Sequence, residues 1–132
     1  MTQIDSQLLQ AAKAAFSRAY APYSSFQVGA AFLGGDGKIY SGCNVENASY
    51  GLSRCAEQTA IQKMVSEGTR AFTKAFVYTL ASPPSSPCGA CRQIMFEFGP
   101  NAEVIMVNDK NETRAFTVCE LLPAGFGPRD LE

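Results

Sequence analysis

Helical and extended sequence patterns alternate along this chain of 132 residues, and this alternation restricts the fold more than any other feature. Over residues 5–20, for example, apolar residues recur at intervals of three and four, which is typical of an amphipathic helix. The patterns predict helices over 5–20, 52–68 and 88–98, strands over 26–33, 38–43, 73–80, 104–107 and 114–118, and a final helical turn over 120–122. This order in so short a chain predicts one domain, residues 1–132, with three α/β/α layers around a five-stranded mixed sheet. Gly29, inside the first expected strand, indicates a close approach of backbone or ligand.

The charge of the chain is nearly balanced, with 11 basic and 12 acidic residues spread along its length. A domain that binds nucleic acid usually gathers Lys and Arg on one face, so we expect a small-molecule substrate and no nucleic acid. Residues 1–10 do not resemble a secretory signal, and no apolar run reaches the ~20 residues of a membrane span. We therefore expect a cytoplasmic protein that makes no use of a membrane.

Three of the five cysteines fall near the starts of two expected helices: Cys55 in the second helix, and Cys88 and Cys91 in the third. Thiolates suit zinc, and two cysteines separated by two residues at a helix start can reach one ion. Helix N-termini also stabilise anionic sulfur. Three protein ligands leave the fourth position of a tetrahedral zinc to water, as in catalytic sites. A fourth ligand from Cys43 or Cys119 would instead close the site, although neither has this spacing.

Glu57 follows Cys55 by two residues, so on a helix it projects at a different angle and can face a metal-bound water without binding the metal. A carboxylate placed there can take a proton from the water and deliver it again. The chain has no histidine, the commonest general base. A carboxylate at a helix start also favours the helix dipole, but beside three cysteines we interpret Glu57 as the proton shuttle.

These segments resemble the cytidine deaminase family, in the small zinc-dependent form whose three metal ligands are all cysteine. The metal-site motifs are Cys55-Ala56-Glu57 and Pro87-Cys88-Gly89-Ala90-Cys91. The likeness covers nearly the whole chain, because it extends to residues 21–24, 26–31, 42–47, 120–123 and 126–127. It implies zinc as the cofactor and a nucleoside as the substrate.

The resemblance implies hydrolytic deamination of cytidine and deoxycytidine to uridine and deoxyuridine plus ammonia, a reaction of pyrimidine salvage. A zinc-bound hydroxide would attack C4 of the base while Glu57 shuttles protons. Asn44 and Glu46 would bind the ribose hydroxyls. Phe26 would pack against the pyrimidine, and Ala56 would offer its backbone N–H to the base. Taken alone, residues 44–47 would more often form a simple turn, and Phe26 would more often belong to the core.

Two further aromatic residues are candidates for a shared site. Phe126 resembles the aromatic residue that completes a neighbouring subunit's pocket in small family members, so the resemblance implies a homotetramer with shared active sites. Tyr50 is interpreted either as a residue of the substrate site or of a subunit interface, or as a buried aromatic residue whose hydroxyl finds a partner.

The residue after the expected catalytic glutamate departs from the family pattern. Many all-cysteine members have Arg there, where its charge offsets the charge of the thiolates, whereas this chain has Gln58. Glutamine can donate hydrogen bonds to sulfur but brings no positive charge. Arg92, directly after Cys91, is our first candidate for the compensating cation, and Arg54 is the second.

Three other functions fit parts of the pattern. A deaminase of another aminopyrimidine, such as blasticidin S, would share the zinc site and differ in its pocket. A zinc-stabilised binding module without turnover would fit Gln58 but would have no use for Glu57. A dithiol redox motif would use Cys88 and Cys91 but would leave Cys55 and Glu57 unexplained.

Overall fold

A computed structural model describes all residues from 1 to 132. Eleven helices, strands and short turns follow one another along the chain. In order they are α1 (Gln3–Phe16), β1 (Gly29–Gly34), β2 (Ile39–Cys43), η1 (Tyr50–Leu52), α2 (Ala56–Ser66), β3 (Phe72–Tyr78), α3 (Gly89–Phe98), β4 (Glu103–Val107), β5 (Thr113–Thr117), α4 (Val118–Leu121) and η2 (Pro128–Leu131).

The five strands form one mixed sheet in the order β2-β1-β3-β4-β5. β1 is antiparallel to both β2 and β3, and β3 is parallel to β4. Consequently β2, β3 and β4 all run in the same direction. The segments that lead from β2 to α2 and from β3 to α3 both leave the carboxyl-terminal edge of the sheet, where ligands of open α/β sheets bind.

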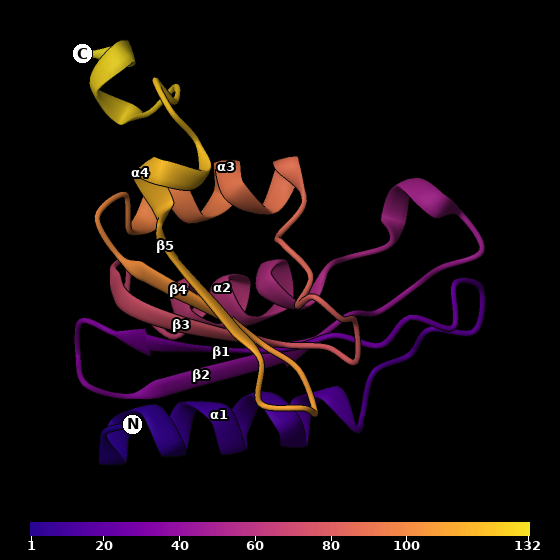
Figure 1. The fold of residues 1–132 in the computed structure, drawn as a ribbon. Coiled ribbons are helices and arrows are strands. Elements are labelled where there is room, and N and C mark those ends of the chain that lie inside the picture. Colours follow the sequence, from indigo (N-terminus) through magenta and orange to yellow (C-terminus); the bar gives the residue numbers. More distant parts are fainter.

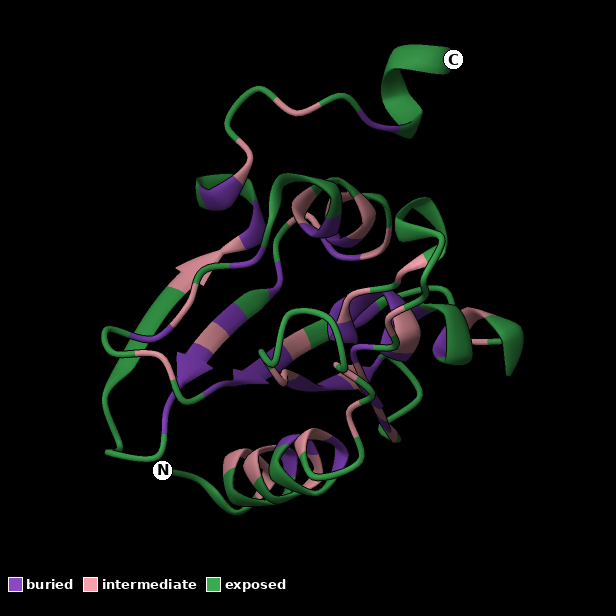
Figure 2. Cartoon of the chain, turned by 90° about the vertical axis from the view of Figure 1, so that its right-hand side faces the viewer, coloured by how far each residue is buried: buried purple, intermediate pink, exposed green.

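Helices cover both faces of the sheet (Figure 1). α1 packs on one face over a small core that includes Leu8, Ala12 and Phe76. α2, α3 and α4 cover the other face over a larger core built around Phe32, Ile61 and Met95. The buried residues gather between these layers, whereas the C-terminal turn η2 is exposed and projects from the body (Figure 2). The three-layer α/β/α architecture expected from the sequence is confirmed.

Two glycines allow helices to approach the sheet closely. A Cβ atom on Gly29 would lie 2.0 Å from the carbonyl oxygen of Ala12 in α1. A Cβ atom on Gly42 would lie 2.5 Å from the backbone nitrogen of Ala60 in α2. The close approach expected at Gly29 is therefore confirmed, and its partner is the backbone of α1.

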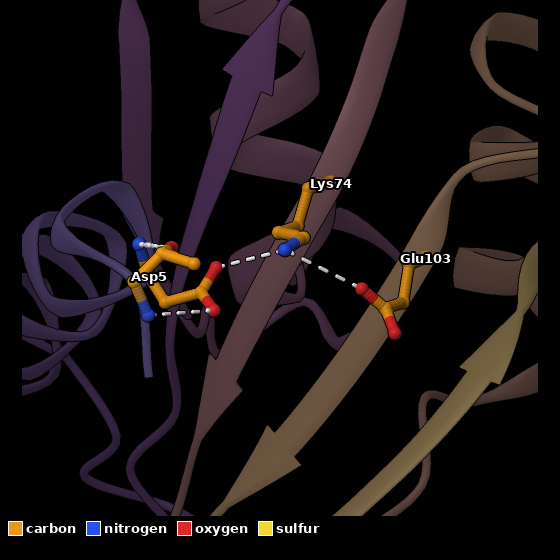
Figure 3. A network of polar contacts seen from close by, with 4 residues as sticks. Asp5, Lys74 and Glu103 are labelled. Carbon is orange, nitrogen blue, oxygen red and sulfur yellow. Dashed lines mark hydrogen bonds and ion pairs between the residues drawn. The ribbon is translucent and has the colours of Figure 1, made fainter.

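Ion pairs join α1 to the sheet at the end opposite the carboxyl-terminal edge, where β3 and β4 begin. The Nζ atom of Lys74 in β3 lies 2.8 Å from Oδ1 of Asp5 in α1 and 3.5 Å from Oε1 of Glu103 in β4 (Figure 3). None of the helices is long and apolar enough to cross a membrane.

Three element boundaries differ by more than two residues from those expected. α1 ends at Phe16 rather than near residue 20, because the Tyr20 backbone pairs with the segment after β2: its N–H donates to the carbonyl of Asn44. β1 begins at Gly29 rather than at Phe26, since residues 26–28 bond to the Asn44 side chain instead of joining the ladder. α2 begins at Ala56 rather than at Leu52, which instead ends the separate turn η1.

Candidate active site

The structure brings Cys55, Cys88 and Cys91 together at the N-termini of α2 and α3. Cys55 is the N-cap of α2, Cys88 is the N-cap of α3, and Cys91 lies in the first turn of α3. The Sγ atoms of Cys55 and Cys88 are 3.8 Å apart, those of Cys88 and Cys91 are 3.3 Å apart, and all three lie within 4.8 Å of one another. Three sulfur atoms at this spacing can share one ion.

The donor set of this cluster fits zinc. Thiolates are preferred zinc ligands, and the Cys91 backbone N–H donates to Cys88 Sγ at 3.5 Å, which helps to hold a sulfur anion. Cys43 and Cys119 do not belong to the cluster, so three cysteines are the protein ligands available and one position remains for a small molecule.

The thiols of Cys55 and Cys91 differ in pKa. The hydrogen bond from Cys91 lowers the pKa of the Cys55 thiol to about 6, with further lowering by Cys88 and by the charge of Arg54. The same bond, together with burial, raises the pKa of Cys91. Cys55 is therefore the first of the two to become a thiolate, the form that binds a metal.

Glu57 is buried in the first turn of α2, with 4% of its surface exposed, and it lines the same cavity as the three cysteines. Burial raises the pKa of Glu57 to about 7, and the nearby Cys55 adds to the effect. A carboxyl group with a pKa near neutrality can both accept and donate a proton, which is the property required of a general acid and base.

A cavity of about 300 Å³ opens beside the cysteines and Glu57 at the carboxyl-terminal edge of the sheet. Its walls come from the loops after α1 and β2, from the end of β3 and from the loop before α3. The lining residues are Ser24, Phe26, Val28, Asn44, Glu46, Ser53, Arg54, Cys55, Glu57, Val77, Thr79, Ser85, Ser86, Cys88 and Cys91.

Asn44 and Phe26 both line this cavity, and the asparagine holds the backbone next to the aromatic ring. The Asn44 side chain accepts from the Val28 N–H at 2.9 Å and donates to the Phe26 carbonyl at 2.8 Å. Asn44 is 8% exposed and Phe26 is 42% exposed. Residues 44–47 therefore fix the loop after α1, and Phe26 lies at the cavity rather than in the core.

Glu46 faces the same loop. Its carboxylate accepts hydrogen bonds from the backbone N–H groups of Tyr23 at 2.9 Å and Ser24 at 3.1 Å, and also from the Ser24 hydroxyl. The Ser24 hydroxyl bond is the main cause that lowers the pKa of Glu46, so this carboxylate is ionised at neutral pH.

The two aromatic residues expected at a shared site lie outside the cavity. Tyr50 is 75% exposed, and its ring packs edge-on against Tyr23 at a centroid distance of 6.1 Å. The alternative of a buried tyrosine is therefore wrong. Phe126 is 57% exposed, and its backbone carbonyl accepts a hydrogen bond from Gln93 Nε2 at 2.8 Å. Neither ring reaches the cavity within a single chain.

Gln58 and the two candidate cations, Arg92 and Arg54, occupy different places. Gln58 is buried and caps α2, because its Oε1 accepts from the Cys55 N–H at 3.1 Å. Arg92 donates all of its hydrogen bonds to oxygen atoms and none to sulfur. Arg54 lines the cavity next to Cys55. Ala56, the first residue of α2, is fully buried and is not among the residues that line the cavity.

Several lining residues were not anticipated from the sequence. Val77 lies at the end of β3 and Thr79 follows directly after that strand, while Ser85 and Ser86 come from the loop before Cys88. The loop serines had one signal, because they directly precede the Pro-Cys motif in the chain. Val77 and Thr79 had none, since an apolar strand end looks the same whether it faces a core or a cavity.

Known proteins share both the sequence and the fold of this chain. Residues 2–107 match the family model described as the cytidine and deoxycytidylate deaminase zinc-binding region. A cytidine deaminase of Sporosarcina psychrophila is 46% identical over 125 residues, which is 94% of this chain and 92% of that protein. The crystal structure of a cytidine deaminase from Burkholderia pseudomallei superposes with a TM-score of 0.89 at 48% identity, over 96% of this chain and all of that one. One from Mycobacterium tuberculosis gives 0.80 at 35% identity, covering 96% and 99%. This chain therefore belongs to the cytidine and deoxycytidylate deaminase family of zinc enzymes.

Proposed function

We propose that this enzyme converts cytidine and deoxycytidine to uridine and deoxyuridine with release of ammonia. The observation that carries the proposal is the buried Glu57, whose pKa of about 7 accompanies its position in one cavity with the three-cysteine cluster. Family membership and relatives named cytidine deaminase over most of the chain support the same reaction.

Cys55, Cys88 and Cys91 would hold the zinc ion. Bound there, zinc would supply the Lewis acid that activates a water molecule as the nucleophile. Glu57 would accept one proton from that water and deliver it to the ring nitrogen, and would then carry the second proton from the oxygen added at C4 to the amino group, so that the carbonyl forms and ammonia leaves. Its burial keeps bulk water from competing for the proton.

The cavity supports a nucleoside as the substrate. Its volume of about 300 Å³ is at the lower end of the range for small-molecule sites. Phe26 and Val77 offer apolar surface for a pyrimidine, while Asn44 and the ionised Glu46 offer an amide and a carboxylate for ribose hydroxyls. The backbone N–H of Ala56, at the first position of α2, would be the donor for the base.

Such a reaction belongs to cytoplasmic pyrimidine salvage, and we propose this setting for the enzyme. The proposal includes a homotetramer, in which the exposed Phe126 of one subunit completes the cavity of another. The exposure of this ring, whose backbone is tied to α3 through Gln93, is compatible with that role.

The first experiment follows the ultraviolet absorbance change as cytidine is converted to uridine, for the purified protein and for Glu57→Gln. We expect turnover by the parent protein and a loss on the order of 10²- to 10⁴-fold in kcat for the variant, because glutamine keeps the shape of the side chain but cannot carry the proton. Zinc content is measured in parallel and should stay unchanged. A zinc-loaded protein that leaves cytidine intact would contradict the proposal and would direct the assay to other aminopyrimidines.

A further inference from the structure

Arg92 occupies an unusual place for a cation, since it lies in the first turn of α3, directly after Cys91. The N-terminal end of a helix carries a partial positive charge, which disfavours a basic side chain there. Its guanidinium is not paired with a carboxylate, because the ion pairs of the structure are both made by Lys74. A local reason must therefore offset the unfavourable position.

The guanidinium of Arg92 instead joins three segments through hydrogen bonds to neutral oxygen atoms. Nε donates to the carbonyl of Pro87 at 2.9 Å, and one terminal nitrogen donates to the Ser86 hydroxyl at 2.9 Å. The other terminal nitrogen donates to the carbonyl of Leu121, at the end of α4, at 2.9 Å. The half-buried side chain thus acts as a rigid fork between α4 and the loop before α3.

This loop determines where Cys88 lies. Cys91 is buried and Cys55 is half-buried within the core face of the sheet, but Cys88 is exposed and follows directly after Pro87. The other side-chain bonds to the loop lie at its far end. The Ala81 N–H donates to the Thr79 hydroxyl, Asn108 donates to the Ala81 carbonyl, Ser82 donates to Glu112, and Arg114 donates to the Pro84 carbonyl. Among the side chains bonded to the loop, Arg92 is the one that holds the residues next to the cysteine.

We propose that Arg92 is a positioning residue of the zinc site, which fixes the Pro87 carbonyl and the Ser86 side chain and thereby holds Cys88 Sγ in place. The proposal rests on the proposed use of the three cysteines as zinc ligands. It differs from the electrostatic support of the thiolates that the sequence led us to expect, because none of the Arg92 bonds ends on sulfur. Through Ser86, which lines the cavity, the same fork sets one wall of the substrate site.

Arg92→Lys separates the positioning role from the electrostatic one, because lysine keeps the positive charge but cannot make the forked set of hydrogen bonds. The zinc-loaded variant is mixed with an excess of a chromophoric chelator. The chelator captures the zinc as the protein releases it, and its absorbance gives the rate of release. We expect release on the order of ten-fold faster than from the parent protein, the scale found when side chains that orient metal ligands are removed. The thiolate-to-metal absorption bands of the Co²⁺-substituted variant should also shift, and KM should rise more than kcat falls. Arg70→Lys, at an exposed position, is the matched control and should leave all three measurements unchanged.

Ser86→Ala provides a second test that leaves Arg92 and its charge in place. It removes one of the three acceptors, and we expect zinc release to be roughly two- to ten-fold faster, the change that loss of one hydrogen bond produces. Parent-like release and cobalt spectra in Arg92→Lys would overturn the proposal in favour of a charge effect. Should Arg92→Lys fail to fold, a parent-like release rate in Ser86→Ala would overturn it. Zinc release needs no turnover, so a protein that holds zinc but does not deaminate cytidine would contradict the proposed function alone.

Discussion

At the scale of single residues, Gly29 shows how closely the sheet and α1 are fitted together. A Cβ atom there would lie 2.0 Å from the Ala12 carbonyl oxygen and 2.5 Å from the Phe16 nitrogen, both backbone atoms that cannot move aside alone. We expect Gly29→Ala to lower the free energy of unfolding by about 1–3 kcal/mol, the usual cost of overpacking, as measured by urea denaturation. The matched control is Gly35→Ala, whose new Cβ would find its nearest atom at 3.6 Å. A change of less than about 0.5 kcal/mol at Gly29, equal to an ordinary surface substitution, would contradict this account.

Individual residues also show how far the sequence could predict the site. The spacing of Cys55, Cys88 and Cys91 predicted the metal cluster, because helix starts and the Cys-x-x-Cys pattern are local features. The role of Arg92 could not be predicted in this way, since its acceptor Leu121 lies 29 residues away and comes close only through the packing of α3 against α4. Long-range contacts of this kind leave no signal in a local pattern.

At the scale of elements, the order of helices and strands was predictable, whereas several of their ends were not. Periodicity identifies an amphipathic helix such as α1, but its last turn is decided by tertiary contacts, here the pairing of Tyr20 with Val45 after β2. The start of α2 has a local cause instead, because Gln58 accepts from the Cys55 backbone N–H and the helix begins directly after the cysteine. A tertiary contact in the first case and a helix cap in the second therefore set boundaries that propensity alone misplaces.

The ion pairs that join α1, β3 and β4 allow a prediction about elements. The hydrogen bond to Lys74 is the main cause that lowers the pKa of Asp5 below its ordinary 3.8, so its contribution to stability is present above that value and is lost as the pH falls through the lower pKa of the folded state. We expect Lys74→Met to reduce the free energy of unfolding by roughly 0.2–1 kcal/mol at pH 7, because both side chains remain partly in contact with water. The difference from the parent protein should shrink below pH 3.8 and at high salt. Lys38→Met at an exposed turn is the control, and an Lys74→Met effect that does not depend on pH would assign the loss to packing instead.

At the scale of the whole molecule, large apolar side chains remain exposed in two regions, the loops beside the cavity and the C-terminal segment. Tyr50 and Leu52 lie in the first region, and Phe126 and Leu131 lie in the second, each with more than half of its surface exposed. Clusters of this kind mark protein interaction sites. In the proposed homotetramer they would contact neighbouring subunits, and sedimentation equilibrium should give a mass about four times the 14.2 kDa of one chain.

The sharing of active sites can be tested by mixing two impaired variants. Glu57→Gln subunits keep Phe126 but lack the proton shuttle, whereas Phe126→Ala subunits keep Glu57 but would lack the ring that completes a neighbour's cavity. After the two are unfolded together and refolded, some sites should combine an intact Glu57 with an intact Phe126 from another chain. We therefore expect cytidine turnover by the mixture to exceed the sum of the two variants assayed separately, because each variant alone has every site impaired. Mixed tetramers that form without any such gain would show that Phe126 acts only within its own chain or in assembly.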